Sequence, residues 1–110
     1  STGGSLRLAE LEKRAALQIL AYLGRKSEHE EPKATVTELR KNIRAALDSI
    51  YTALEVLQDL GLIEKQTEKN FPFATYYKLT QYGYMAATLL VDLEELLAKA
   101  EAGRGGEGGE

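Results

Sequence analysis

Apolar residues recur every three or four positions near the start of the chain, with charged residues between them. This spacing is typical of an amphipathic helix, and its apolar stripe is Leu8, Leu11, Ala15, Ile19 and Leu23. We predict a helix from about residue 6 that Gly24 ends, because glycine favours the left-handed conformation found at helix ends. The polar segment 25–34 follows, and Pro32 within it excludes a helix there.

A capping signal opens the next helical region. Thr35 and Glu38 stand in a T-x-x-E pattern, in which the threonine hydroxyl accepts a hydrogen bond from the backbone N–H near the glutamate, and the glutamate reaches back. The pattern predicts a short helix over 36–42. A longer helix over 47–60 should then end at Gly61 as a left-handed cap. The inward stripe of that helix is Leu47, Ile50, Leu54 and Leu57, with Ala53 and Leu60 beside it.

The period of the pattern then changes from about 3.6 to 2. Residues 62–67 suit one strand, 68–72 a turn, and 73–79 a returning strand rich in aromatic and β-branched residues. Thr80 should cap a last helix over about 81–102, roughly 30 Å long at 1.5 Å per residue.

The predicted order is helix, helix, helix, strand, strand, long helix. Two short helices followed by a two-stranded hairpin indicate a winged helix-turn-helix, so the fold class is α+β and mostly helical. The second helix of the pair can enter a major groove about 12 Å wide, and the hairpin, or wing, can reach the adjacent groove or the phosphates. We expect one domain over 6–102, a flexible N-terminus over 1–5 and a disordered Gly/Glu tail over 103–110.

Two runs of residues resemble a known family. Ser49-Ile50-Tyr51-Thr52-Ala53-Leu54, with Leu57 and Gly61-Leu62-Ile63, is similar to the L-Y-x-A-L-x-x-L-x-x-x-G-L-I run of PadR-like transcriptional regulators. Thr75-Tyr76-Tyr77-Lys78-Leu79-Thr80 and Gly83 resemble the Y-Y-x-L-T-x-x-G that closes their wing. MarR-like and small archaeal regulators share much of this pattern. The resemblance covers about 35–102 and implies a winged-helix regulator that binds double-stranded DNA.

The chain departs from this pattern in two places. An H-G-Y-E-like segment common in PadR proteins is missing from the first helix and loop. Arg44 stands where helix-turn-helix turns often carry glycine, so either the turn differs or Arg44 adopts a left-handed conformation.

The candidate DNA contacts come from three places. On the outward face of the 47–60 helix, Ser49, Tyr51 and Thr52 can bond to bases or phosphates. Arg40, Lys41 and Arg44 on the preceding helix and turn suit phosphates, and the wing carries Lys65, Lys69 and Lys78. Two alternatives stay open: Tyr51 could be packed with its hydroxyl satisfied, and Arg40 and Lys41 could be solvated surface. Asp48 and Glu55 share the outward face and would repel phosphate.

Phe71-Pro72-Phe73 stands at the tip of the predicted wing. An exposed phenylalanine there could wedge into a groove or meet a partner. The interpretation we favour from the sequence is that Phe73 packs under the wing and Phe71 covers it.

The apolar arc of the last helix is too wide for one contact. Its two stripes are Tyr82, Met85, Leu89, Leu93 and Leu96, and Ala86, Leu90, Leu93, Leu97 and Ala100. We predict that one side packs within the chain and the other forms a two-fold homodimer, although an elaborate monomer is an alternative. The expected interface is Leu8, Leu11, Met85, Leu89, Leu90, Leu93, Leu96 and Leu97. A dimer would set two recognition helices about 34 Å apart, which predicts a pseudo-palindromic site.

Composition narrows the function further. The 110 residues fit one domain and contain no cysteine, which excludes disulfide scaffolds and thiolate zinc sites. The single histidine, His29, lies among glutamates in what we interpret as a solvated loop, so we expect no metal. No signal peptide, membrane span or nucleophile, phosphate or dinucleotide motif is present. We expect a cytoplasmic protein that is not an enzyme and needs no cofactor. A small-molecule effector between the dimer helices is conceivable, but no polar cluster marks it.

The net charge of −3 argues against DNA binding at first. However, residues 33–78 hold seven basic and six acidic groups, or +1, whereas residues 79–110 hold two basic and six acidic groups, or −4. The acid therefore lies mainly on the predicted dimer helix and tail. The alternative function is a protein-interaction winged helix in a transcription or replication assembly, which the acidic residues of the recognition helix motivate.

Overall fold

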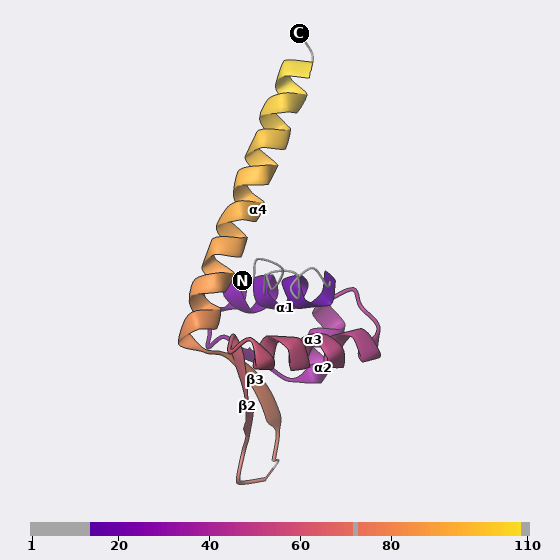
Figure 1. The fold of residues 1–110 in the computed structure, drawn as a ribbon, viewed down its shortest axis with the longest axis vertical. Helices are drawn as coiled ribbons and strands as arrows, with labels where there is room; N and C mark the ends of the chain where they lie inside the picture. Colours follow the sequence, from indigo (N-terminus) through magenta and orange to yellow (C-terminus); the bar gives the residue numbers. More distant parts are fainter. Residues whose placement is uncertain (1–13, 72, 109–110) are drawn as a thin grey trace, which may run out of the picture.

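The computed structural model describes residues 14–71 and 73–108 (Figure 1). Within them the chain forms four helices and a three-stranded sheet. In chain order the elements are α1 Arg14–Lys26, β1 Lys33–Ala34, α2 Val36–Asn42, α3 Leu47–Asp59, β2 Ile63–Thr67, β3 Thr75–Leu79 and α4 Gln81–Gly108. The predicted mostly helical α+β class and the winged helix-turn-helix order are confirmed. The predicted positions 6–13, with Leu8 and Leu11, lie outside the described residues.

The sheet contains a strand that the sequence pattern did not predict. Its order is β1-β3-β2 and both pairs are antiparallel, with Lys33 opposite Lys78 and Ile63 opposite Leu79. β1 has only two residues, too few for an alternating pattern. It begins directly after Pro32, whose carbonyl accepts a hydrogen bond from Leu79 N–H at 3.0 Å. The segment predicted as a polar loop therefore supplies the third strand of the wing.

The prediction that Gly24 ends the first helix is wrong, because α1 runs on to Lys26. Gly24 is buried inside the helix, where a Cβ atom would lie 2.9 Å from the Ala87 Cβ of α4. The glycine thus allows two helices to approach closely.

The boundaries of the helix-turn-helix pair agree with the sequence. α2 matches its predicted range, and Glu38 N–H donates to the Thr35 hydroxyl at 3.1 Å. The Glu38 carboxylate turns toward α1 instead of reaching back as predicted. Gly61 has φ +78° and ends α3 as expected. Leu47 is a correction: it is 36% exposed, since it lies at the first turn of α3 beyond the edge of the core.

The core lies where α1 packs against α3 on one side and α4 on the other (Figure 1). Its largest fully buried side chains are Ile19, Leu20 and Leu23 of α1, Leu39 of α2, and Ile50, Leu54 and Leu57 of α3. Ile63, Tyr77 and Leu79 extend this core to the base of the wing. The buried face of α3 fixes which of its residues face outward.

A compact joint connects α3, the wing and α4. The Thr80 hydroxyl donates to Gly61 O at 2.6 Å and accepts from Gly83 N–H at 3.0 Å, so the predicted cap of the last helix is confirmed. Thr80 N–H also donates to Leu62 O at 3.0 Å. A Cβ atom on Gly83 would lie only 1.7 Å from that same carbonyl oxygen. The first turn of α4 is therefore pressed against the end of α3.

α4 extends well beyond the core (Figure 1), and its 28 residues make it about 42 Å long. Its buried positions are Gly83, Ala87 and Val91, which neither predicted stripe contains. Leu90 is half-buried against the core, so its place in the expected dimer interface is wrong. The helix also continues through Gly108, past the predicted end near 102, because extending a formed helix requires no new nucleation.

Candidate nucleic-acid interface

α3 presents a polar face away from the core. Ser49 and Thr52 are exposed on it, and Tyr51 is 48% exposed, so the alternative that Tyr51 is packed in the core is wrong. Asp48 and Glu55 are exposed on the same helix. The outward face thus offers hydroxyl groups for hydrogen bonding, with two carboxylates beside them.

Three cations lie exposed on α2 and the turn after it: Arg40, Lys41 and Arg44. The turn begins at Ile43, whose φ of −123° and ψ of 135° are extended. Arg44 N–H donates to the Gln18 side chain of α1 at 3.2 Å. Among the non-glycine residues described, positive φ occurs only at Phe73. The turn therefore differs from the glycine-containing form, and Arg44 is not left-handed.

The wing lysines lie on two different faces of the sheet. Lys65 is opposite Tyr77, on the face that turns toward the helices, whereas Lys78 is opposite Glu64 on the other face. Lys65 and Lys69 are exposed, but the half-buried Lys78 lies 3.4 Å from Glu31. A hydrogen bond from Lys78, with the charges of Lys33 and Lys78, lowers the pKa of the exposed Glu31 carboxyl. Lys78 is thus separated from the other candidate contacts and already has an acidic partner.

An open groove of about 500 Å³ lies between the helix-turn-helix and the wing. Tyr51 of α3 and Lys65 of β2 border it together, so two residues predicted separately from the sequence meet there. The groove is further lined by Thr35, Val36, Thr37, Ala74, Thr75 and Tyr77. Sequence reasoning missed Thr37 and Thr75. The only available signal was that hydroxyl side chains recur at the start of α2 and of β3.

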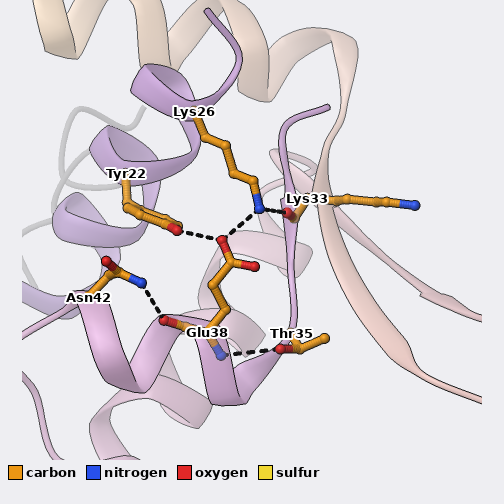
Figure 2. Close-up of polar contacts among 6 residues, drawn as sticks. All are labelled: Tyr22, Lys26, Lys33, Thr35, Glu38 and Asn42. Atoms are coloured by element: carbon orange, nitrogen blue, oxygen red, sulfur yellow. Dashed lines mark hydrogen bonds and ion pairs between the residues drawn. The ribbon is translucent and has the colours of Figure 1, made fainter. Parts of the chain in front are cut away.

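A polar network fixes α2 against α1 (Figure 2). The carboxylate of Glu38 accepts a hydrogen bond from the Tyr22 hydroxyl and pairs with Lys26 Nζ at 2.6 Å. Lys26 Nζ also donates to Lys33 O of β1 at 2.8 Å. Three elements therefore meet at one carboxylate, which holds the helix that carries Arg40 and Lys41.

The same network shifts two pKa values. Burial, together with the hydrogen bond to Glu38, raises the pKa of Tyr22 to about 12. Burial acts to raise the pKa of Glu38 as well, but the hydrogen bonds from Lys26 and Tyr22 outweigh it and lower that pKa. Glu38 is therefore ionised and Tyr22 neutral at neutral pH, as the hydrogen bond between them requires.

The wing tip, by which we mean Phe71 and Phe73, differs from its prediction. Phe71 is 85% exposed and Phe73 58% exposed, so the interpretation that they pack under the wing is wrong. Their rings contact each other edge to face, with centroids 6.0 Å apart. Pro72 lies outside the described residues.

Metal-binding and membrane-spanning features are absent from the part of the chain that the structure describes. Across residues 14–71 and 73–108, no group of three His, Asp or Glu side chains is placed to hold a metal ion. His29 is exposed. None of the helices in that part of the chain is long and apolar enough to span a membrane.

Comparisons with known proteins bear on the fold. No protein-family profile matches the chain, and no curated protein matches it. Among solved structures, the chain is similar to one described as a possible HxlR family transcriptional factor from Thermoplasma volcanium, with TM-score 0.75 and 19% identity over 93% of this chain and 87% of that one.

Two further structures have the same arrangement. For a mutant of Lactococcus lactis ZitR in its apo form, the TM-score is 0.73 and the identity 18%, over 96% of this chain and 75% of that one. This chain spans only 60% of the length of ZitR in a second mutant structure. For a transcriptional regulator homologue from Pyrococcus horikoshii, the TM-score is 0.65 and the identity 16%, over 84% of this chain and 87% of that one.

At such low identities these likenesses establish the fold and leave the family open, and they give no support to the PadR-like branch in particular. What they share with this chain is the arrangement of helix-turn-helix, wing and surrounding helices. The chain therefore has the winged-helix fold found in structures of transcriptional regulators.

Proposed function

We propose that this protein binds double-stranded DNA as a homodimer and regulates transcription. α3 would enter the major groove, and the wing would lie on the adjacent groove or backbone. The observation that carries the proposal is the shared groove, where Tyr51 of α3 and Lys65 of the wing face the same space. Arg40, Lys41 and Arg44 are exposed beside it for phosphate contacts. Solved regulators of the same fold support this assignment.

The residue roles follow from their positions. Ser49, Tyr51 and Thr52 would bond to base edges or phosphates, and Lys65 and Lys69 would contact phosphates. We leave Lys78 out of the proposed interface, because it lies on the other face of the sheet beside Glu31.

The homodimer rests on the apolar side chains that α4 leaves exposed. These are Tyr82, Met85, Leu89, Leu93, Leu96 and Leu97. Large apolar residues that recur along one helix in this way suit a partner helix, and a second copy brings the same surface. Two copies would double the cations offered to one duplex.

Some finer assignments belong to this proposal. We place the protein in the cytoplasm, without catalytic activity or a cofactor. The branch of regulators stays a hypothesis: the residues of 49–63 and 75–83 suggest the PadR-like branch, with the MarR-like and small archaeal branches as alternatives. An effector is compatible with the dimer, but no residue marks its site.

A second candidate function has one specific observation in its favour. Asp48 and Glu55 are exposed on the recognition helix, where they would repel phosphate. An acidic face suits a basic protein partner, so the alternative is a protein-interaction winged helix.

The dependence of DNA affinity on salt separates the two. We expect the full chain to bind duplexes selected from a random pool, with affinity that falls steeply as salt rises. The triple variant Arg40→Ala, Lys41→Ala, Arg44→Ala should flatten the slope by about three phosphate contacts, and Lys41→Ala alone by about one. Lys99→Ala, which removes a cation from α4, is the matched control and should leave the slope unchanged. Binding that is undetectable at low salt would refute the DNA proposal.

A further inference from the structure

The wing tip carries two aromatic side chains that the proposed DNA contacts do not use. The β2–β3 hairpin projects away from the helices (Figure 1), and the tip lies at its far end. Phe71 is 85% exposed there, and Phe73 58% exposed. Such exposure is costly for phenylalanine, since burying its side chain is favourable by about 2 kcal/mol. A function that needs apolar surface at this point would explain it.

The backbone holds these rings in a defined position. Phe73 has φ +58°, a conformation that is uncommon for a bulky residue. Its N–H donates to Asn70 O at 2.8 Å, and Glu68 N–H donates to Ala74 O at 2.9 Å, so the turn is closed by two hydrogen bonds. The rings contact each other edge to face at 6.0 Å. The structure keeps a strained aromatic residue outward where a glycine would suit the backbone better.

The surroundings of the tip show what kind of partner fits. Residues 64–70 are polar or charged and exposed, so the two rings are an isolated apolar point and no part of a wider patch. A stable protein interface needs about 800 Å² on each partner, far more than two side chains offer. A step between two base pairs is a partner that needs only a small wedge, because apolar side chains that insert there unstack the bases and kink the duplex.

Charge and continuity point to the same partner. Lys69 lies two residues before Phe71, and Lys65 lies on the same strand side of the hairpin, facing the proposed DNA groove. A duplex held by α3 and Lys65 would continue along the wing toward its tip. We propose that Phe71 and Phe73 form a wedge that inserts between base pairs of the bound duplex and bends it. This inference rests on the proposed function.

The test uses the full chain and a duplex carrying the site selected from a random pool. Fluorescent base analogues placed in turn at each flanking step report unstacking, and energy transfer between dyes at the two duplex ends reports bending. The wild-type protein should unstack one step on each side of the site. The double variant Phe71→Ala, Phe73→Gly should lose both signals and bind about tenfold more weakly. Glycine at position 73 keeps the backbone conformation available.

Phe71→Leu is the matched control, because leucine also acts as a wedge; it should retain most of the unstacking. Helical content and the mass of the double variant should match the wild type, which excludes misfolding as the cause. A duplex that binds with a normal salt slope but shows no unstacking overturns the wedge and leaves the proposed function intact. So does a double variant that bends DNA normally but loses a protein partner. Undetectable DNA binding by the wild type refutes both proposals.

Discussion

The two faces of α4 have opposite residue sizes and opposite burial. The packed face, Gly83, Ala87 and Val91, is built of small side chains and is buried against α1 and the end of α3. The open face, Met85, Leu89, Leu93 and Leu96, is built of large apolar side chains, and Leu89 is 71% exposed. Size therefore separates two kinds of contact on one helix: small residues permit close approach within the chain, and large ones remain for a partner.

The largest effect should come from the packed face. Replacing Gly83 with alanine places a Cβ atom 1.7 Å from the Leu62 carbonyl oxygen, which is backbone and cannot turn away. We expect a loss of about 4 kcal/mol or more in the free energy of unfolding, measured by urea denaturation. Gly103→Ala on the same helix meets nothing within 4 Å and serves as the control. If both variants are equally stable, Gly83 is not the close contact that defines the packed face.

The open face should respond in assembly and not in folding. Leu89→Glu places a charge on the proposed dimer interface, and two copies bring two such charges together. We expect the dissociation constant of the dimer to rise about a hundredfold, measured by analytical ultracentrifugation. Thr88→Glu adds the same charge at the neighbouring exposed position and should leave the dimer intact. A wild-type chain that is monomeric at all concentrations would remove the partner from the comparison.

A compensating pair sharpens the account of the packed face. In Gly24→Ala the new Cβ lies 2.9 Å from the Ala87 Cβ, and overpacking should cost about 2 kcal/mol. Ala87→Gly removes that methyl group, so the double variant should recover much of the loss. The four denaturation curves of this cycle give the coupling energy between the two positions. Additive effects would mean that the helices do not meet there.

The smallest effect concerns α1, which supports the packed face and is tied to α2 through Glu38. The folded-state pKa of Glu38 is lowered, so its contribution to stability is complete above the usual pKa of 4.5 and is lost as pH falls through the folded value. Glu38→Gln should cost about 1 kcal/mol at pH 7. Below the folded pKa the variant and the wild type should converge in stability. A gap that stays constant between pH 7 and 3 would contradict this role for the carboxylate.

The sequence predicted the elements that carry their own local signals. Thr35, Gly61 and Thr80 marked helix ends by chemistry that acts within a few residues, and all three act as predicted. It failed where distant segments meet. Gly24 was interpreted as a cap because its partner, Ala87, is far away in the chain, and β1 is too short to show a period.

The candidate site shows the same division. The outward face of α3 follows from helical periodicity, and Ser49, Tyr51 and Thr52 are exposed as that requires. That Lys65 and Lys78 lie on opposite faces depends on strand register, which the sequence did not specify. The exposure of Phe71 and Phe73 contradicts the usual preference of phenylalanine for the interior, so no general rule of burial could predict it.

The joint at Thr80 has a consequence for how the molecule opens and closes. One hydroxyl bonds to the last turn of α3 and to the first turn of α4, and the backbone N–H of the same residue bonds to Leu62 at the base of the wing. The amide protons of Thr80 and Gly83 should then exchange with solvent through a single cooperative opening, at one rate. The recognition helix, the wing and the long helix would share that local unfolding unit, although they form three separate elements.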